Sequence, residues 1–227
     1  PAQLIPYLNE RRINVIIWAV SAMRIVSNYK ILDIHVPKYL SLVMFSGEVM
    51  PVKALNDWME HLPDTKFVNL YGPTEITCNC TYYQVEKRFA NEEVLPIGRA
   101  FKNTGVFLLD EENREITDKT TDVIGEICVK GTCLALGYFN NQEKAGEVFV
   151  QNPNNKYYRD IIYRTGDIGV LDSRGYLYLK GRNKSMILGP SGQNIYPEEI
   201  ESGINNLPYV AESLVEDEKG QLVALVY

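Results

Sequence analysis

The sequence predicts an α/β fold made of a parallel-sheet layer, a β-rich subdomain and an incomplete small α+β C-terminal subdomain. Three observations predict it. Helix-like stretches alternate with short apolar runs up to about residue 94, and β-rich runs separated by turn residues occupy 95–180. A loop, a short helix and final strands then follow the Gly181-Arg182 pair. Alternation of helices and strands in the first part is typical of a parallel sheet.

The part up to about residue 94 carries the signals of an α/β layer. Apolar residues recur at helical spacing over 4–8 and 52–62, and Pro51 suits a first helical turn. The β-rich runs at 15–18, 42–45 and 67–70 are short and apolar, as strands buried in a parallel sheet are.

The part from 95 to 180 is predicted to be a smaller antiparallel sheet or barrel. Its β-rich runs are separated by Gly, Asn and Asp turns, without a long amphipathic helix between them. These runs lie at 104–109, 124–130, 161–163 and 176–179.

Beyond a hinge region at 181–182, residues 183–227 are predicted to open a small subdomain. An apolar run at 186–188 precedes a Gly-Pro-Ser-Gly loop at 189–192, and a helix begins at Pro197. Glu198 and Glu199 in its first turn complement the helix dipole, so we predict a structural role for them. The last strand reaches Tyr227 without a turn, so we expect this subdomain to be incomplete.

Composition and charge exclude some classes of protein. The net charge of -6 and the absence of a Lys/Arg cluster argue against a nucleic-acid partner. No apolar run approaches the roughly 18 to 20 residues that cross a bilayer, so no membrane span is expected. The start, Pro1-Ala2-Gln3-Leu4, has neither Met nor a signal pattern, so we expect a cytoplasmic location and a chain that begins within a longer protein.

The four cysteines, Cys78, Cys80, Cys128 and Cys133, lie in apolar, strand-like contexts. Their spacing matches no common zinc-ligand pattern and no His lies near them. We therefore expect buried, reduced thiols without a chemical role.

A strand predicted at 67–70 runs into Asn-Leu-Tyr-Gly-Pro-Thr-Glu at 69–75. This places a Gly-Pro turn at the carboxyl edge of a sheet, where open α/β sheets bind ligands. Tyr71 offers a flat ring, Thr74 a hydroxyl and an N–H for a phosphate, and Glu75 a carboxylate for a hard cation. A plain loop with a solvated glutamate explains the same residues equally well.

Two further segments carry candidate polar groups. Over 163–167, the sequence predicts a tight loop in which Asp167 follows a glycine, and a carboxylate there can accept both hydrogens of a ribose diol. An ordinary turn between strands is the alternative. Arg182 is placed to reach a phosphate or ribose oxygen, and Lys184, between two subdomains, is a candidate hinge residue.

In their order along the chain, these segments resemble the adenylate-forming superfamily of acyl-CoA ligases, luciferases and adenylation domains of peptide synthetases. The matching residues are Ser46-Gly47-Glu48, 69–75, Pro96-Ile97-Gly98, Gly125-Glu126-Ile127 through Gly131 to Gly137-Tyr138, 163–167, Gly181-Arg182 and 198–201. By this resemblance, 1–180 is the C-terminal part of the large adenylation core and 183–227 is the start of the small mobile subdomain.

The resemblance implies a binding site for the adenine nucleotide. Tyr71 is expected to stack on one face of the adenine base. The backbone of Ser46, Gly47 and Glu48 is expected on the other face of the base. Asn69 and Gly72 are expected beside them in the same site.

The remaining matching residues are expected to contact the ribose and the phosphates. Thr74 is implied to contact the α-phosphate and Glu75 to help hold Mg²⁺, which makes these two the candidate catalytic residues. Asp167 is implied to bind the ribose hydroxyls and Arg182 to approach the nucleotide. Lys184 stands where the family has its hinge Asp or Lys.

In such enzymes a carboxylic acid attacks the α-phosphorus of ATP and releases pyrophosphate. The small subdomain then rotates so that a thiol takes the acyl group. The resemblance therefore implies ATP/AMP and Mg²⁺ as cofactors, a small carboxylic acid as substrate, and the phosphopantetheine thiol of a carrier protein or CoA as acceptor. Positioning and charge neutralisation carry such chemistry, and rotation lets one site serve two half-reactions.

Two family elements are absent from the 227 residues. They are the Ser/Thr/Gly-rich phosphate loop and the C-terminal loop whose lysine stabilises the adenylation transition state. Loss of such a cation costs orders of magnitude in rate, so we expect the isolated chain to be inactive.

The subfamily signals differ along the chain. Residues 45 to about 181 are most similar to D-alanine carrier-protein ligases and peptide-synthetase adenylation domains, whereas 184–197 resemble long-chain acyl-CoA ligases, with Leu188 where many relatives carry a lysine. The acid pocket is expected near 18–23 and 76–80 in the large core, which favours an amino acid as substrate. An acyl-CoA ligase for a fatty or aryl acid and a non-catalytic nucleotide-binding module stay open as alternatives.

Overall fold

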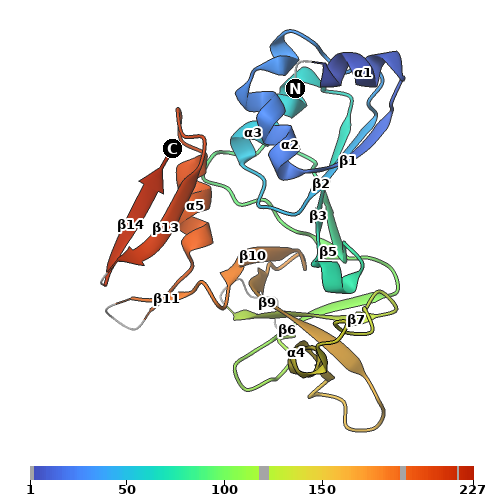
Figure 1. Cartoon of the computed structure of the whole chain (residues 1–227), viewed down its shortest axis with the longest axis vertical. Coiled ribbons are helices and arrows are strands. Elements are labelled where there is room, and N and C mark those ends of the chain that lie inside the picture. Colours follow the sequence, from blue (N-terminus) through green and yellow to red (C-terminus); the bar gives the residue numbers. More distant parts are fainter. Residues whose placement is uncertain (1–2, 118–122, 190–192, 219) are drawn as a thin grey trace.

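The computed structural model describes residues 3–117, 123–189, 193–218 and 220–227. Figure 1 shows a first sheet with its helices, a second sheet below it, and the C-terminal segment, residues 183–227, beside both. The predicted α/β class, with its succession of sheets, is confirmed. The boundaries near residues 94 and 181 stay predictions, and the first sheet extends to Ala100.

The first sheet has five strands in the order β1-β2-β3-β4-β5. Their bounds are Val15–Ala19, Leu42–Ser46, Lys66–Tyr71, Thr81–Gln84 and Arg99–Ala100. The predicted parallel pairing is confirmed for β1, β2 and β3, but β4 and β5 pair antiparallel. The connection from β3 to β4 holds only the short 3-10 turn η2 (Thr74–Ile76), whereas a parallel pairing needs a crossover of a dozen or more residues.

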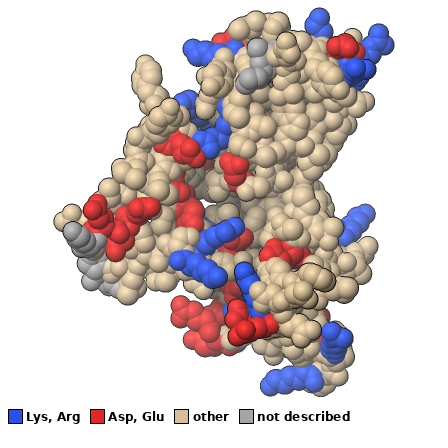
Figure 2. Space-filling view, in the orientation of Figure 1, with Lys and Arg blue, Asp and Glu red and all other residues tan. Residues whose placement is uncertain are grey.

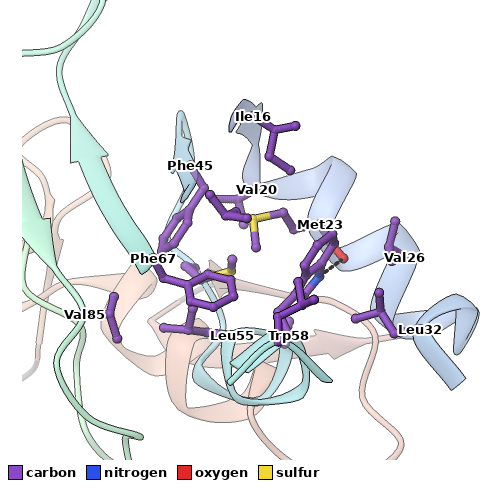
Figure 3. Packing of buried hydrophobic residues seen from close by; sticks show 14 of the residues in the cluster. Ile16, Val20, Met23, Val26, Leu32, Phe45, Leu55, Trp58, Phe67 and Val85 are labelled. Carbon is purple, nitrogen blue, oxygen red and sulfur yellow. Dashed lines mark hydrogen bonds between the residues drawn. The ribbon is translucent and has the colours of Figure 1, made fainter. Parts of the chain in front are cut away.

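Three helices and a 3-10 turn pack on one face of this sheet: α1 (Leu4–Glu10), α2 (Val20–Asn28), η1 (Ile31–Asp33) and α3 (Val52–His61). Figure 3 shows apolar side chains of α2 and α3, such as Met23 and Leu55, packed near Phe45 and Phe67 of the sheet. Trp58 is completely buried there, and its indole N–H donates to the carbonyl of Met23 at 3.2 Å. A buried indole usually finds such a partner, so this bond fixes α3 against α2.

The other face of β1 is less covered than the sequence predicts. Val15 is 44% exposed and Ile17 is 55% exposed, while Ile16 between them is buried. Successive side chains of a strand point to opposite faces, so β1 is covered by helices on one face only. The prediction that this strand is buried on both faces is therefore wrong for the residues described.

The second sheet is antiparallel throughout, with strand order β10-β9-β7-β6 and β8 paired to β9. Strands β6 to β10 are Thr104–Leu109, Ile124–Gly131, Phe149–Gln151, Ile161–Leu171 and Leu177–Arg182. The helix α4 (Gln142–Val148) follows β7 and is capped by the Asn141 side chain, which accepts from Lys144 N at 3.1 Å. The antiparallel alternative predicted for this part is confirmed.

The C-terminal segment contains a helix and two small antiparallel pairs. Strands β11 (Ile187–Leu188) and β12 (Asn194–Ile195) form one pair, and β13 (Ser213–Glu218) and β14 (Gln221–Val226) form the other. Helix α5 (Pro197–Asn205) begins with Pro197 and two glutamates, as predicted. Of the predicted 189–192 loop, residues 190–192 lie outside the described residues, as do Pro1 and Ala2.

The C-terminal segment is held against α2 and α3 by polar side chains. Asn206 is buried; its Oδ1 accepts from Lys53 N at 3.3 Å, and its Nδ2 donates to the carbonyl of Asn91 at 3.0 Å. Lys53 Nζ donates to the carbonyl of Leu207 at 3.4 Å, and Arg24 donates to the carbonyl of Ala211.

Asn206 acts as an N-cap for α3 from a distant part of the chain. The sequence predicts Pro51 in the first helical turn, but in the structure Pro51 precedes that turn. Its backbone is extended, and no side chain of its own caps the helix. Lys53 is the second residue of α3, and N-cap side chains normally accept from the second or third backbone N–H of a helix. A side chain 153 residues away in sequence therefore accepts a hydrogen bond from a backbone N–H that has no partner within this helix.

All four cysteines are free thiols. Cys80 and Cys128 are buried, and burial, with smaller contributions from Cys133 and Asp167, raises the pKa of Cys80 to about 12. Cys78 is exposed, so the prediction of burial is wrong for this residue. No described helix is long and apolar enough to cross a membrane.

Candidate active site

A cavity of about 240 Å³ lies where the two sheets and the C-terminal segment meet. Its walls come from the carboxyl ends of β2 and β3, from residues 94–97, from strands β9 and β10, and from the first turn of α5. The lining residues are Gly47, Glu48, Val49, Met50, Asn69, Leu70, Tyr71, Gly72, Pro73, Val94, Leu95, Ile97, Asp167, Leu179, Gly181, Arg182 and Glu198. Figure 2 shows acidic and basic side chains around the hollowed middle of this face. The carboxyl edge of an α/β sheet is where ligands bind, as predicted for 69–75.

Tyr71 and Asp167 meet on the wall of this cavity. The Tyr71 hydroxyl donates to Asp167 Oδ2 at 2.6 Å, and only 7% of Asp167 is exposed. Burial raises the pKa of Asp167, and the Glu198 carboxylate adds to this, while Tyr71 and the Arg182 guanidinium oppose it. Burial, followed by the Asp167 charge, also holds the pKa of Tyr71 well above its ordinary value, so the phenol remains a donor.

The sequence predicts Asp167 in a tight loop, but the structure places it inside the long strand β9. The register between β7 and β9 shifts between Glu126 and Cys128, so extra residues of β9 bulge opposite β7. Gly166 has a φ of +73° in this bulge, a left-handed conformation that glycine adopts without strain. The Thr165 hydroxyl donates to the carbonyl of Ile127 at 2.7 Å and accepts from Asp167 N at 3.0 Å, so the bulge aims the carboxylate at the cavity.

Arg182 lies opposite Asp167 in the β9–β10 pairing. Its Nε approaches Asp167 Oδ1 at 3.3 Å, and its side chain is 74% exposed. A partly solvated guanidinium beside a buried carboxylate can turn towards a phosphate or a ribose oxygen. Lys184 is exposed and does not line the cavity, so its hinge role stays a prediction.

Glu198 is a residue of the cavity wall for which the sequence predicts only a structural role. Its Oε1 accepts from the Ser185 hydroxyl at 2.7 Å, and its Oε2 is buried without a partner. A Cβ on Gly181 would stand 2.6 Å from this Oε2, so a larger residue at this position would have to displace the Glu198 carboxylate. The position of Glu198 depends on the docking of α5 on β10, which no local sequence signal reports.

The segment 46–48 after β2 contributes to the cavity only in part. Gly47 and Glu48 line it, and the Glu48 carboxylate lies 3.9 Å from the Arg24 guanidinium. Ser46 is the last residue of β2 and does not line the cavity. The exposed backbone at Gly47 is compatible with the predicted contact to a flat base, which stays a prediction.

Asn69 holds one side of the cavity in place. It is buried, and its Nδ2 donates to the carbonyl of Pro96 at 2.8 Å. The neighbouring strand β4 holds the same segment in place, because the hydroxyl of its Thr81 donates to the carbonyl of Ile97 at 2.6 Å. These bonds position an apolar wall that the sequence prediction missed, made of Val94, Leu95 and Ile97 together with Val49, Met50, Leu70 and Leu179.

Thr74 and Glu75 lie beyond Gly72 and Pro73 and do not line the cavity. Thr74 is exposed, and the Glu75 Oε1 accepts from the Tyr138 hydroxyl at 2.5 Å. Partial burial alone raises the pKa of Glu75, but the hydrogen bond from Tyr138 and the Lys144 charge outweigh it, so the net shift is downward. Glu75 is therefore an ionised carboxylate near neutral pH.

The residues present fit the predicted magnesium in one respect. The described chain holds no group of three or more His, Cys, Asp or Glu side chains that would form a cage of protein ligands. Magnesium is usually held by one or two carboxylates together with the phosphates of the substrate, and the ionised Glu75 supplies one such carboxylate. Its role as a metal ligand stays a prediction.

The α/β fold agrees with the resemblance to the adenylate-forming superfamily, and comparison with known proteins shows the same family. The sequence profile of the AMP-binding enzymes matches residues 1–139. This chain belongs to the family of AMP-binding enzymes.

Relatives come from several branches of the family. Bacitracin synthase 1 of Bacillus licheniformis is 28% identical over 97% of this chain and 4% of its own length. The D-alanine--D-alanyl carrier protein ligase of Streptococcus pneumoniae is 30% identical over 75% of this chain and 31% of its own. The mitochondrial medium-chain acyl-CoA ligase ACSF2 of Bos taurus is 30% identical over 74% and 26%.

A solved structure shows the same fold. PA1221, a peptide-synthetase protein with adenylation and PCP domains, matches 98% of this chain and 38% of its own with a TM-score of 0.73 and 27% identity. This chain therefore spans less than a third of the curated relatives it matches and under two fifths of this solved chain.

Proposed function

We propose that this chain is the nucleotide-binding part of an enzyme that activates a carboxylic acid, an amino acid in preference, as its acyl-adenylate. The acyl group is then transferred to the phosphopantetheine thiol of a carrier protein. The observation that carries the proposal is the Tyr71–Asp167 pair on the wall of a cavity at the carboxyl edge of the first sheet. The family membership supports the reaction class.

In this proposal the cavity holds the nucleoside of ATP. The Tyr71 ring packs against adenine, with the backbone of Gly47 and Glu48 on the other side. The Asp167 carboxylate has two oxygens with about four acceptor positions, and Tyr71 and Arg182 use two of them. The remaining positions can accept both ribose hydroxyls.

The phosphates lie towards Thr74 and Glu75 in the proposed arrangement. A magnesium ion there would neutralise phosphate charge, and Glu75 would hold it. The hydroxyl and backbone N–H of Thr74 donate to the α-phosphate while a carboxylate oxygen of the acid attacks the phosphorus and pyrophosphate leaves. The thiol then attacks the acyl carbonyl and AMP leaves. Positioning and charge stabilisation are the main contributions of a protein to such steps.

Two finer points belong to the same proposal. The relatives named for peptide synthesis and for a D-alanyl carrier protein favour an amino acid and a carrier-protein acceptor. The similarity to an acyl-CoA ligase supports the second candidate, a fatty or aryl acid with CoA as acceptor. A cytoplasmic location and the lack of a nucleic-acid partner remain predictions.

The proposal is tested by calorimetric titration of the 227-residue chain with AMP and with non-hydrolysable aminoacyl-adenylate and fatty-acyl-adenylate mimics. We expect binding of AMP and tighter binding of an aminoacyl mimic. Tighter binding of the fatty-acyl mimic would favour the second candidate. A folded chain that binds none of these ligands would contradict the proposed function.

A matched pair of variants locates the site. Asp167→Asn removes a carboxylate of the cavity, whereas Asp172→Asn removes a buried carboxylate just after β9 that bonds Arg174 and Tyr176 outside the cavity. We expect a roughly ten-fold or larger loss of AMP affinity in the first variant, since a hydrogen bond to a charged group contributes about 1.5–3 kcal/mol. The second variant is expected to bind AMP normally.

A further inference from the structure

The loop that follows β7 is tied to the turn that carries Glu75. The Thr77 hydroxyl donates to the carbonyl of Cys133 at 2.8 Å, and Ala135 N donates to the carbonyl of Glu75 at 2.8 Å. The Tyr138 hydroxyl donates to the Glu75 carboxylate itself. Three hydrogen bonds therefore join segments that lie about 60 residues apart in sequence. Two of them end on backbone carbonyls, and the third joins two side chains.

The turn that these bonds hold is strained. Thr77 and Cys78 are consecutive non-glycine residues with φ of +63° and +83°, in the left-handed region. Such conformations are costly for residues with a Cβ and persist only where the surroundings enforce them. The bonds from the β7 loop are among the contacts that enforce them, so Glu75 is presented by a turn held in a fixed shape.

Tyr138 is itself held in position. Its ring lies edge-on to Phe149 with centroids 5.9 Å apart, and Lys144 Nζ lies 5.4 Å from its centroid. Phe149 in turn packs on Tyr163 of β9 at 5.0 Å. The hydroxyl of Tyr138 is therefore fixed relative to the second sheet, and it transmits that position to one oxygen of Glu75.

We propose that Tyr138 is a positioning residue that fixes the Glu75 carboxylate for the magnesium–phosphate group of the bound nucleotide. This inference rests on the proposed function, in which Glu75 contacts that ion. Magnesium demands nearly ideal octahedral geometry, so a carboxylate with one oxygen fixed by a hydrogen bond binds it better than a freely rotating one. Loss of a partner of this kind typically weakens metal binding about 10–100-fold.

The test uses the 227-residue chain and its Tyr138→Phe variant, which keeps the ring and its packing but removes the hydroxyl. Binding of AMP without metal and of a non-hydrolysable ATP analogue over a range of Mg²⁺ concentrations is measured by calorimetry. We expect metal-free AMP affinity to change less than about two-fold, and the Mg²⁺ concentration for half-maximal analogue binding to rise about ten-fold or more.

A chemically matched control is Tyr178→Phe. The Tyr178 hydroxyl lies 3.4 Å from the carboxylate of Asp172, so this change also removes a phenol beside a carboxylate, but away from Glu75. We expect its Mg²⁺ dependence to equal that of the unmodified chain. Thermal unfolding of both variants shows whether either change disturbs the fold.

A double-mutant cycle separates positioning from a general structural effect. In a Glu75→Gln background, Tyr138→Phe is expected to produce no further change in Mg²⁺ dependence, because the carboxylate it positions is already gone. An additional ten-fold effect in that background would overturn the inference, as would an unchanged Mg²⁺ dependence in the single variant.

If Tyr138→Phe lowers thermal stability so far that it is partly unfolded, Glu75→Asp provides the second variant. It shortens the side chain away from the Tyr138 hydroxyl, and the Mg²⁺ requirement is expected to rise in the same way. If the unmodified chain binds neither AMP nor the analogue, the proposed function fails and the inference falls with it. Normal AMP binding with an unchanged Mg²⁺ requirement in Tyr138→Phe, while Glu75→Gln raises that requirement, overturns the inference alone.

Discussion

The cavity has one side built into the sheets and one side supplied by the C-terminal segment, and the two are held in different ways. Tyr71 and Asp167 lie on β3 and β9, whose backbones pair with neighbours along most of their length. Glu198 is brought in by α5, which is fixed to the helices of the first sheet through polar contacts of Asn206, Lys53 and Arg24. The first side is therefore preorganised, and the second depends on contacts that are individually weak.

This difference indicates how the two sides divide the work in the proposed reaction. A rigid pair such as Tyr71 and Asp167 suits a nucleoside that is bound throughout both half-reactions. A side held by a few hydrogen bonds can move at a free-energy cost of a few kcal/mol, which is typical of elements that change position during turnover. The predictions below test that contrast, from the largest expected effect to the smallest.

Trp58→Ala should remove the support of the rigid side. Trp58 is completely buried between α3 and α2, so its truncation leaves a large void and costs about 3–5 kcal/mol of unfolding free energy. Urea denaturation followed by circular dichroism measures the loss. A cost below about 1 kcal/mol would show that the core in Figure 3 does not set the stability of the first sheet.

Asp167→Asn should act on affinity more than on stability, and its effect should depend on pH. The pKa of Asp167 is raised above its ordinary value of 3.8, chiefly by burial. Ribose binding by the ionised carboxylate is therefore expected to weaken as pH falls through this raised pKa, at a higher pH than for an exposed aspartate. AMP titrations from pH 7 down to pH 4 measure this, and the Asn variant is expected to show no such decline.

The same shift has the opposite sign for stability. A raised pKa means that the folded state favours the protonated carboxyl group, so the contribution of Asp167 to stability is fully present below the unfolded pKa. It is lost as pH rises through the folded pKa. Asp167→Asn is expected to remove this dependence, which is read from urea midpoints in the same pH series.

Asn206→Ala should loosen the C-terminal segment while leaving the sheets unchanged. It removes the N-cap of α3, an effect of about 1 kcal/mol, and the bond to the Asn91 carbonyl. We expect faster hydrogen exchange over residues 193–218 and unchanged exchange in β2 and β3. Equal acceleration in β2 and β3 would contradict the division into a rigid and a loosely held side.

Arg182→Ala should have the smallest effect. The Arg182 side chain itself is 74% exposed, and ion pairs of such solvated groups contribute little, so AMP affinity is expected to fall less than about five-fold. Calorimetry at two salt concentrations measures this, and the difference from the unmodified chain is expected to shrink at high salt. A loss as large as that of Asp167→Asn would show that Arg182 belongs to the rigid side.

Much of the fold follows from local patterns in the sequence, because strand runs and helical spacing are local properties. The edges of β6 and the start of α5 at Pro197 were predictable in this way. The position of Asp167 inside a strand was not, because the bulge exists only opposite β7. The antiparallel direction of β4 also depends on tertiary structure. It follows only once the short connection after β3 is known to reverse the chain.

The candidate site shows the same limit. Tyr71, Asp167 and Arg182 stand out in the sequence because each follows or flanks a glycine-containing turn, and the structure brings these three together. Glu198 and Tyr138 reach their partners only through tertiary packing, Glu198 through α5 and Tyr138 through the loop after β7. The acidic residues Glu216, Asp217 and Glu218 of β13 are exposed on the outer side of the C-terminal segment, where Figure 2 shows acidic side chains.

The cavity draws its walls from six stretches of the chain, spread from Gly47 to Glu198. A molecule that occupies it touches both sheets and the C-terminal segment at once and acts as a reversible cross-link among them. Binding to the folded state alone adds about 2.7 kcal/mol to its free energy of unfolding when the free ligand is at a hundred times its dissociation constant. The melting temperature of this chain is therefore expected to rise with the concentration of the ligand that occupies the cavity.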